Sequence, residues 1–283
     1  MNDNVKEQLD QIKKENPLLK RKNKFPGETF RLPSKGLLYY NGELDDEVKD
    51  GEVTIYPMTT LDEIYMKTPD MLFQGTAIDV VFKRCIPQIK KPLDLFSNDV
   101  DFLLTALRKV SYGNHILINH VCEFCGETSK KEHEYSIPLN FFIQNTKEFS
   151  IEDVDNLKMI LSTGEQVILK PLTFSEMLKT MQMNDTDIKS PEDIANILVE
   201  TLSSTIRTVD GVVEKEFIEE WLSSLPTQII SEFSSKLEKL NKWGTNFEYT
   251  IRCKDCDKEQ KINTILNPLY FFILPSNQKI SIE

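Results

Sequence analysis

The feature that most constrains this sequence is a pair of C-x-x-C motifs set far apart in the chain. Cys122 and Cys125 form the first motif, and Cys253 and Cys256 form the second. Because strand-like runs flank each motif, each cysteine pair is expected at the tip of a β-hairpin. Two such tips supply four thiolates, which is the ligand set of a tetrahedral structural zinc site. The sequence therefore predicts one structural Zn²⁺ per chain, held by all four cysteines.

Other uses of these cysteines stay open. A redox pair is typical of a helix N-terminus beside a βα unit, whereas strands flank both motifs here. Disulfides fit poorly with an intracellular chain, which we expect because the N-terminus is polar and lacks the apolar stretch of a secretory signal. Ligands that are lost or unused are a further alternative. His120 and His133 lie near the first motif and could substitute as ligands, whereas Cys85 is expected in the core.

An internal repeat is the second constraint on the fold. Residues 53–63 and 167–176 each read as a strand, a proline and a threonine suited to cap a helix, Thr59 in one copy and Thr173 in the other. A helical pattern of apolar residues follows in both copies. Its positions are Ile78, Val81, Phe82 and Cys85 in the first copy and Ile194, Ile197, Leu198 and Leu202 in the second.

The repeat continues into the cysteine motifs. Further helices are predicted over residues 100–110 and 229–240, and nine positions lead from Gly113 to Cys122, as from Gly244 to Cys253. After each motif comes a second strand and then a segment with two adjacent phenylalanines, Phe141-Phe142 and Phe271-Phe272. We therefore predict an α+β fold of two pseudo-repeats, each with a strand, helices and a knuckle hairpin, joined by a zinc-ribbon-like Cys₄ site.

The expected domain organisation follows from this repeat and from the charge distribution. A basic N-terminal arm takes residues 1–29, the first repeat 30–145 and the second repeat 146–283. The net charge is −11, although residues 1–24 hold seven Lys/Arg against four Asp/Glu and include a predicted helix over residues 4–16. The acidic remainder makes nucleic acid a poor main partner. No apolar run approaches the ~20 residues that cross a bilayer, so no membrane partner is expected.

Motifs of catalysis are missing from the sequence. It contains no G-x-G-x-x-G, P-loop, H-E-x-x-H or G-x-S-x-G pattern, and its three histidines fall within residues 115–133. Four thiolates would also leave a metal ion no open position for substrate or water. We therefore expect a protein that is not an enzyme.

Several motifs in this order resemble one known family. They are Leu32-Pro33-Ser34-Lys35-Gly36 with Leu37-Leu38-Tyr39, then Pro57-Met58-Thr59-Thr60-Leu61-Asp62-Glu63, then Phe102-Leu103-Leu104…Leu107-Arg108…Ser111-Tyr112-Gly113 before Cys122-Glu123-Phe124-Cys125-Gly126. The chain resembles the baseplate hub and hub-assembly proteins of T-even-type contractile-tailed bacteriophages. The resemblance runs from about residue 25 onward and is strongest in the first copy. In the second knuckle, Asp257 stands where the first has Gly126, which leaves the geometry of that turn open.

The resemblance implies a component or assembly factor of the tail baseplate hub that binds other baseplate proteins. Such a protein would be found in the host cytoplasm during assembly and in the virion tail baseplate. The surfaces expected to bind partners are the N-terminal arm, the turn over residues 32–40 and any exposed copy of the phenylalanine pairs; buried copies would be core. The alternative is a zinc-ribbon protein of phage transcription or packaging that binds nucleic acid. It would require a basic surface around the knuckles, from Lys130, Lys131, Lys254, Lys258 and Lys261.

Overall fold

The computed structural model describes residues 25–125, 132–184, 190–240, 242–263 and 280–282. Within these residues, helices alternate with small sheets of two or three strands, so the fold is mixed α and β as predicted. The predicted helix over residues 4–16 and most of the basic arm lie outside the described residues.

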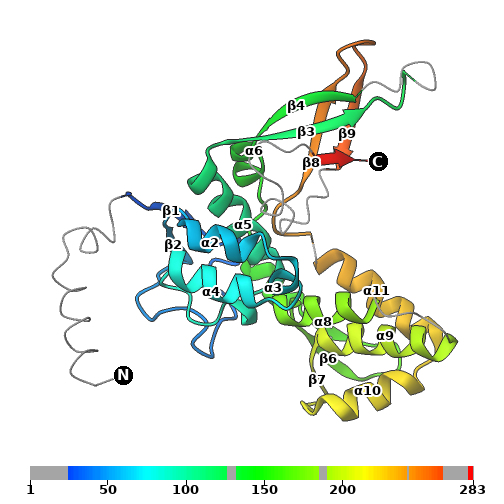
Figure 1. Ribbon diagram of the computed structural model, residues 1–283. Helices are drawn as coiled ribbons and strands as arrows, with labels where there is room; N and C mark the ends of the chain where they lie inside the picture. The colour runs from blue at the N-terminus through cyan, green and yellow to red at the C-terminus, as the bar shows by residue number, and fades with distance from the viewer. Residues whose placement is uncertain (1–24, 126–131, 185–189, 241, 264–279, 283) are drawn as a thin grey trace, which may run out of the picture.

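The first half begins with a small β-sheet and continues through helices to a hairpin and a short final helix (Figure 1). Its elements are β1 (Glu28–Arg31), β2 (Glu52–Ile55), α2 (Thr60–Met66), α3 (Pro69–Phe73), α4 (Thr76–Cys85), the 3₁₀ turn η1 (Pro92–Asp94), α5 (Ser97–Tyr112), β3 (His115–Val121), β4 (Glu132–Pro138) and α6 (Leu139–Gln144). The predicted helix over residues 100–110 is the interior of α5.

The second half is richer in helix and also ends in a hairpin. Its elements are α7 (Ile151–Asp155), β5 (Lys158–Ile160), β6 (Gln166–Leu169), α8 (Phe174–Asn184), α9 (Pro191–Ser204), β7 (Ile206–Val209), α10 (Lys215–Ser224), α11 (Thr227–Leu240), β8 (Glu248–Arg252), β9 (Glu259–Asn263) and β10 (Ile280–Ile282). The predicted helix over residues 229–240 is therefore α11, two residues longer at its start.

The strands in the described part of the chain form four separate sheets. β1 pairs with β2, β8 pairs with β9, and β5, β6 and β7 form an antiparallel sheet with β6 in the middle. The fourth sheet has β3 at its centre, antiparallel to β4 and parallel to β10. Figure 1 shows the β3–β4 and β8–β9 hairpins side by side at one end of the molecule, away from α8–α11.

The two threonines predicted to cap helices both do so, each with an acidic partner three residues on. Thr59 Oγ1 accepts a hydrogen bond from the Asp62 N–H at 3.4 Å, and Asp62 Oδ2 accepts one from the Thr59 N–H at 2.8 Å. Thr173 and Glu176 make the same exchange at 3.4 and 3.0 Å. Each exchange satisfies two N–H groups that the first turn of a helix leaves without partners. This local chemistry determines where α2 and α8 begin.

Two apolar cores lie among the residues that the structure describes, and they do not follow the chain order. The first core joins β1, β2 and α2–α6, and it also takes Ile251 and Ile262 from the second hairpin and Leu178 from α8. The second core lies among α7, α9, α10, α11 and the β5–β6–β7 sheet and includes Phe149 and Trp243. The β8–β9 hairpin therefore packs on the first half of the chain, although α11 before it belongs to the second core.

The apolar positions predicted for the two middle helices have different environments. Ile78, Val81, Phe82 and Cys85 of α4 are all at most 2% exposed, whereas in α9 Ile194 is 58% and Leu198 is 45% exposed. The physical reason is the neighbour that each helix meets. The half-buried face of α9 carries Glu200, whose carboxylate pairs with Lys179 of α8 at 2.6 Å and Lys215 of α10 at 2.5 Å. Glu200 thus lies between α8 and α10, and Leu202 is the position of this apolar pattern that α9 buries.

The turn over residues 32–40, which was expected to be a surface for partners, is only partly exposed: residues 32–34 are buried and residues 35–39 are half-buried. The buried carboxylate of Asp99 on α5 accepts hydrogen bonds from the Ser34 N–H at 2.9 Å and the Tyr39 hydroxyl at 2.7 Å. The Tyr39 oxygen in turn accepts the Phe96 N–H at 2.8 Å, and the two rings stack with centroids 4.6 Å apart. Only Tyr40, at 70% exposure, points clearly outward. These hydrogen bonds and the ring stacking connect residues 34 and 39 to the start of α5.

Candidate metal centre

The four predicted cysteines meet at one point. Cys122 follows β3 directly and Cys253 follows β8 directly, so both motifs lie at hairpin tips as expected. The four Sγ atoms all lie within 4.8 Å of one another, with 3.6 Å between Cys122 and Cys256 and between Cys125 and Cys253. A tetrahedron with Zn–S bonds of ~2.3 Å has S–S edges of about 3.8 Å, whereas a disulfide requires ~2.05 Å. The arrangement fits a tetrahedral metal ion, and none of the four cysteines is in a disulfide.

The second knuckle has the turn that a C-x-x-C motif needs. The Cys253 N–H donates to the Lys258 carbonyl at 2.9 Å, and the Asp255 N–H points at Cys253 Sγ at 3.4 Å. Asp257 takes the left-handed conformation, with φ of 58°, which aspartate tolerates better than most residues with a side chain. The second knuckle therefore forms its turn with Asp257 at the position where the first knuckle has glycine. Gly126 itself lies outside the described residues.

The thiol pKa values differ within the cluster for identifiable reasons. Backbone N–H groups, first that of Cys256 and then that of Asp255, lower the pKa of Cys253 to about 6. Hydrogen bonding to the thiols of Cys256 and Cys253 raises the pKa of Cys125. The thiols therefore differ in acidity, and a metal ion that bound all four sulfurs would displace the protons that they still carry.

The two histidines near the site are engaged elsewhere. His120 Nε2 lies 3.2 Å from Gln260 Oε1, and His133 Nε2 lies 2.7 Å from Asp255 Oδ2. Neither ring belongs to the group of side chains that could hold a metal, which contains the four cysteines alone among the described residues. Cys85 is 2% exposed on α4 and burial raises its pKa to about 12, as expected of a core cysteine.

Sequence reasoning missed Gln260, which contacts the site from the second hairpin. Its Nε2 donates to Cys122 Sγ at 2.8 Å, and its Oε1 accepts the Glu123 N–H at 3.2 Å. The available signal was strand alternation: Gln260 shares a face of β9 with Ile262, and both are buried.

Aromatic packing also joins α6, the helix that follows the first hairpin, to the second hairpin. Phe142, at 0% exposure, lies with its ring centroid 5.6 Å from that of Phe247, and Phe141 contacts Tyr249 edge-to-face at 4.9 Å. Phe142 is thus core, whereas Phe141 remains 38% exposed. The second pair, Phe271 and Phe272, lies outside the described residues.

Basic side chains near the described knuckle residues already have partners within the protein. Lys254 Nζ donates to the Glu134 carbonyl at 2.6 Å, and Lys258 Nζ lies 4.9 Å from the centroid of the Phe124 ring. Lys261 pairs with Glu248 at 4.0 Å. Lys130 and Lys131 lie outside the described residues.

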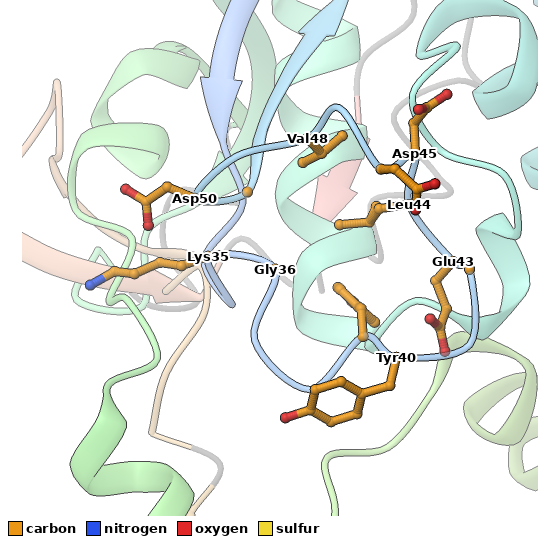
Figure 2. Close-up of a pocket in the computed structure, with 12 residues that line it drawn as sticks. Lys35, Gly36, Tyr40, Glu43, Leu44, Asp45, Val48 and Asp50 are labelled. Carbon is orange, nitrogen blue, oxygen red and sulfur yellow. The ribbon is translucent and has the colours of Figure 1, made fainter.

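A separate cavity of about 310 Å³ lies beneath the loop between β1 and β2 (Figure 2). Figure 2 shows Lys35 and Asp50 on one side of it and Glu43 and Asp45 on the other. These charges are largely paired: Asp45 with Lys90 at 2.7 Å, Asp50 with Arg31, and Glu43 with the Asn41 N–H at 2.8 Å. The cavity is therefore lined by groups that hold the loop in place.

Comparison with known proteins places the chain in a family. Neither the curated proteins nor the solved structures include one that matches the chain. Among the described residues, no helix is both long and apolar enough to span a bilayer. A family model described as T4 bacteriophage base plate protein matches residues 40–273, most of the chain and both cysteine motifs. The chain belongs to this family of baseplate proteins of T4-like phages.

Proposed function

We propose that this baseplate protein is a component or assembly factor of the tail baseplate hub, and that it acts as a binding scaffold without enzymatic activity. One structural zinc ion, held by Cys122, Cys125, Cys253 and Cys256, would stabilise it. The observation that carries the metal proposal is the convergence of four sulfurs from two distant hairpins within 4.8 Å. A Cys₄ set favours zinc and leaves no coordination position for a substrate.

The energetic role of this ion would be to join the two halves. Structural zinc contributes roughly 10–16 kcal/mol in zinc-finger peptides, which is comparable to the ~5–15 kcal/mol that stabilises a whole protein. Each 3.6 Å contact joins a sulfur of one hairpin to a sulfur of the other. The ion would therefore act as a clasp between segments about 130 positions apart.

We further propose that the halves are pseudo-repeats related by duplication. The order of elements supports this, since each half runs from a strand through a capped helix and longer helices to a knuckle hairpin. The capping exchanges of Thr59 with Asp62 and of Thr173 with Glu176 support it as well. The ion would then lie near a pseudo-twofold axis between the two hairpins.

Other baseplate proteins are the partners that this proposal implies. Nucleic acid is disfavoured because Lys254, Lys258 and Lys261 are engaged within the protein and the chain carries a net charge of −11. Cross-linking mass spectrometry of infected cells and of purified virions tests the assignment. We expect cross-links to hub proteins. Cross-links confined to proteins outside the baseplate, or salt-dependent retention on DNA or RNA, would contradict it.

A further inference from the structure

The side-chain amide of Gln260 connects the two hairpins directly at a metal-binding sulfur. Gln260 lies in β9 of the second hairpin and is 6% exposed, yet its three polar contacts are all to the first hairpin. They are Cys122 Sγ at 2.8 Å, the Glu123 N–H at 3.2 Å and His120 Nε2 at 3.2 Å. Gln260 is thus 138 positions from the cysteine that it contacts.

The chemistry of these neighbours determines which way the amide points. The backbone N–H of Glu123 can only donate, so it must face the Gln260 oxygen. The amide NH₂ group then faces Cys122 Sγ and donates to it. Because Oε1 accepts, His120 Nε2 carries the proton in this arrangement, and a chain of donors runs from His120 through Gln260 to the sulfur. Successive hydrogen bonds of this kind polarise one another and strengthen the last one.

A reciprocal contact lies on the other side of the site. His133 of β4, 7% exposed, reaches across to Asp255, which lies between the cysteines of the second knuckle. Each hairpin therefore sends one buried polar side chain from its returning strand to the knuckle of the other. Gln260 differs from His133 in that it contacts a sulfur itself.

We propose that Gln260 is a positioning residue for the metal centre, which orients Cys122 and stabilises its thiolate so that the two knuckles hold one ion. The proposal rests on the metal site proposed above. An N–H donor to a thiolate withdraws electron density from the sulfur and restricts its rotation, so its loss should weaken binding while leaving all four ligands in place. Changes to side chains that orient metal ligands typically cost 10–100-fold in affinity.

Two substitutions separate the contacts of Gln260. Gln260→Met has similar length and removes both the donor to Cys122 and the acceptor for the Glu123 N–H. Gln260→Glu keeps an oxygen for the Glu123 N–H and loses the amide donor to the sulfur. Lys261→Met is the matched control, because Lys261 is the next residue of the same strand and its side chain is 76% exposed.

The test uses the full chain loaded with Co²⁺ or Zn²⁺ and titrated with a chelator. In both Gln260 variants we expect chelator to remove the metal at roughly 10–100-fold lower concentration. The visible bands of tetrahedral Co²⁺ should keep their intensity, while the sulfur-to-cobalt charge-transfer band moves to lower energy. The Lys261→Met protein should behave like the unaltered one.

Three results would overturn parts of this argument in distinguishable ways. Unchanged affinity and unchanged charge-transfer energy in both Gln260 variants would exclude the positioning role while leaving the metal site intact. Weak binding by Gln260→Met with normal binding by Gln260→Glu would assign the effect to the Glu123 contact and overturn the sulfur contact. Failure of the unaltered protein to take up either metal would overturn the metal site and this inference together.

Discussion

The sulfur atoms of Cys125 and Cys253 lie 3.6 Å apart although 128 positions separate these residues in the chain. Their approach brings the tip of the β3–β4 hairpin to the tip of the β8–β9 hairpin, and the second hairpin buries Ile251 and Ile262 in the core of the first half. A metal ion bound by both cysteines would close a loop of 128 positions between them. A cross-link at this place therefore restricts the unfolded chain strongly, since the entropic cost of closing a loop grows with its length.

Removal of one sulfur tests the metal directly. Cys253→Ser should lower the zinc content from one ion per chain towards zero and lower the free energy of unfolding, because three thiolates bind zinc more weakly than four. Elemental analysis and urea unfolding measure the two effects. Cys85→Ala is the control: it deletes a buried thiol of α4 outside the cluster, so zinc should stay at one per chain. Unaltered protein that is purified without chelator and contains no zinc would refute the site.

Asp99 should make stability depend on pH in the acidic range. Burial raises the pKa of its carboxyl from 3.8 to about 6 in the folded protein. The folded state therefore binds this proton more tightly than the unfolded state, and the stabilisation that protonation provides is lost as pH rises from about 4 through 6. The size is on the order of 2–3 kcal/mol. Urea unfolding at several pH values measures it.

The comparison with Asp99→Asn isolates this carboxyl, because burial also raises the pKa of Asp101, to about 7. An asparagine oxygen can still accept the Ser34 N–H, while the titrating group is gone. The Asp99→Asn protein should lose less stability than the unaltered protein between pH 4 and 6. Equal pH dependence in the two proteins would mean that Asp99 does not titrate in this range.

Alanine substitutions at two glycines of one loop should distinguish the stability lost to an unfavourable backbone conformation from the stability lost to a steric clash. Gly42 and Gly51 have φ of 74° and 69°, but a Cβ on Gly51 would lie 2.6 Å from the Lys35 carbonyl carbon, whereas nothing lies within 4 Å of one on Gly42. Gly42→Ala should cost about 1–2 kcal/mol. Gly51→Ala should cost about 1–3 kcal/mol more from the clash. Thermal unfolding compares them, and equal losses would contradict the close approach.

The adjacent phenylalanines of α6 should contribute unequally. Phe142 is fully buried against Phe247 and Tyr249, so Phe142→Ala should cost roughly 3–5 kcal/mol. Phe141→Ala should lower the free energy of unfolding clearly less, because Phe141 is 38% exposed. Denaturant unfolding of the two alanine variants measures the difference. If Phe141→Ala lowered the free energy of unfolding more than Phe142→Ala, then Phe141 and not Phe142 would make the main contact between α6 and the second hairpin.

Local features of the fold were predictable from sequence, and features that depend on distant neighbours were not. The caps at Thr59 and Thr173 and the hairpins at the cysteine motifs depend on residues a few positions apart, and the structure confirms them. The apolar spacing of α9 was read correctly as a helix. That spacing did not reveal that Ile194 and Leu198 face solvent, because exposure depends on which distant segments pack against the helix.

The two C-x-x-C motifs separate what the sequence predicts from what only the tertiary structure determines. Residue type and spacing alone determined a set of four thiolates at two hairpin tips, because ligand chemistry and tight turns are local properties. Only the tertiary structure decided that the second hairpin packs on the first core, that Asp99 accepts a hydrogen bond from the Ser34 N–H of the 32–40 turn, and that Gln260 donates to Cys122. A sequence shows that a side chain needs a partner, whereas the packing of distant segments decides which group that partner is.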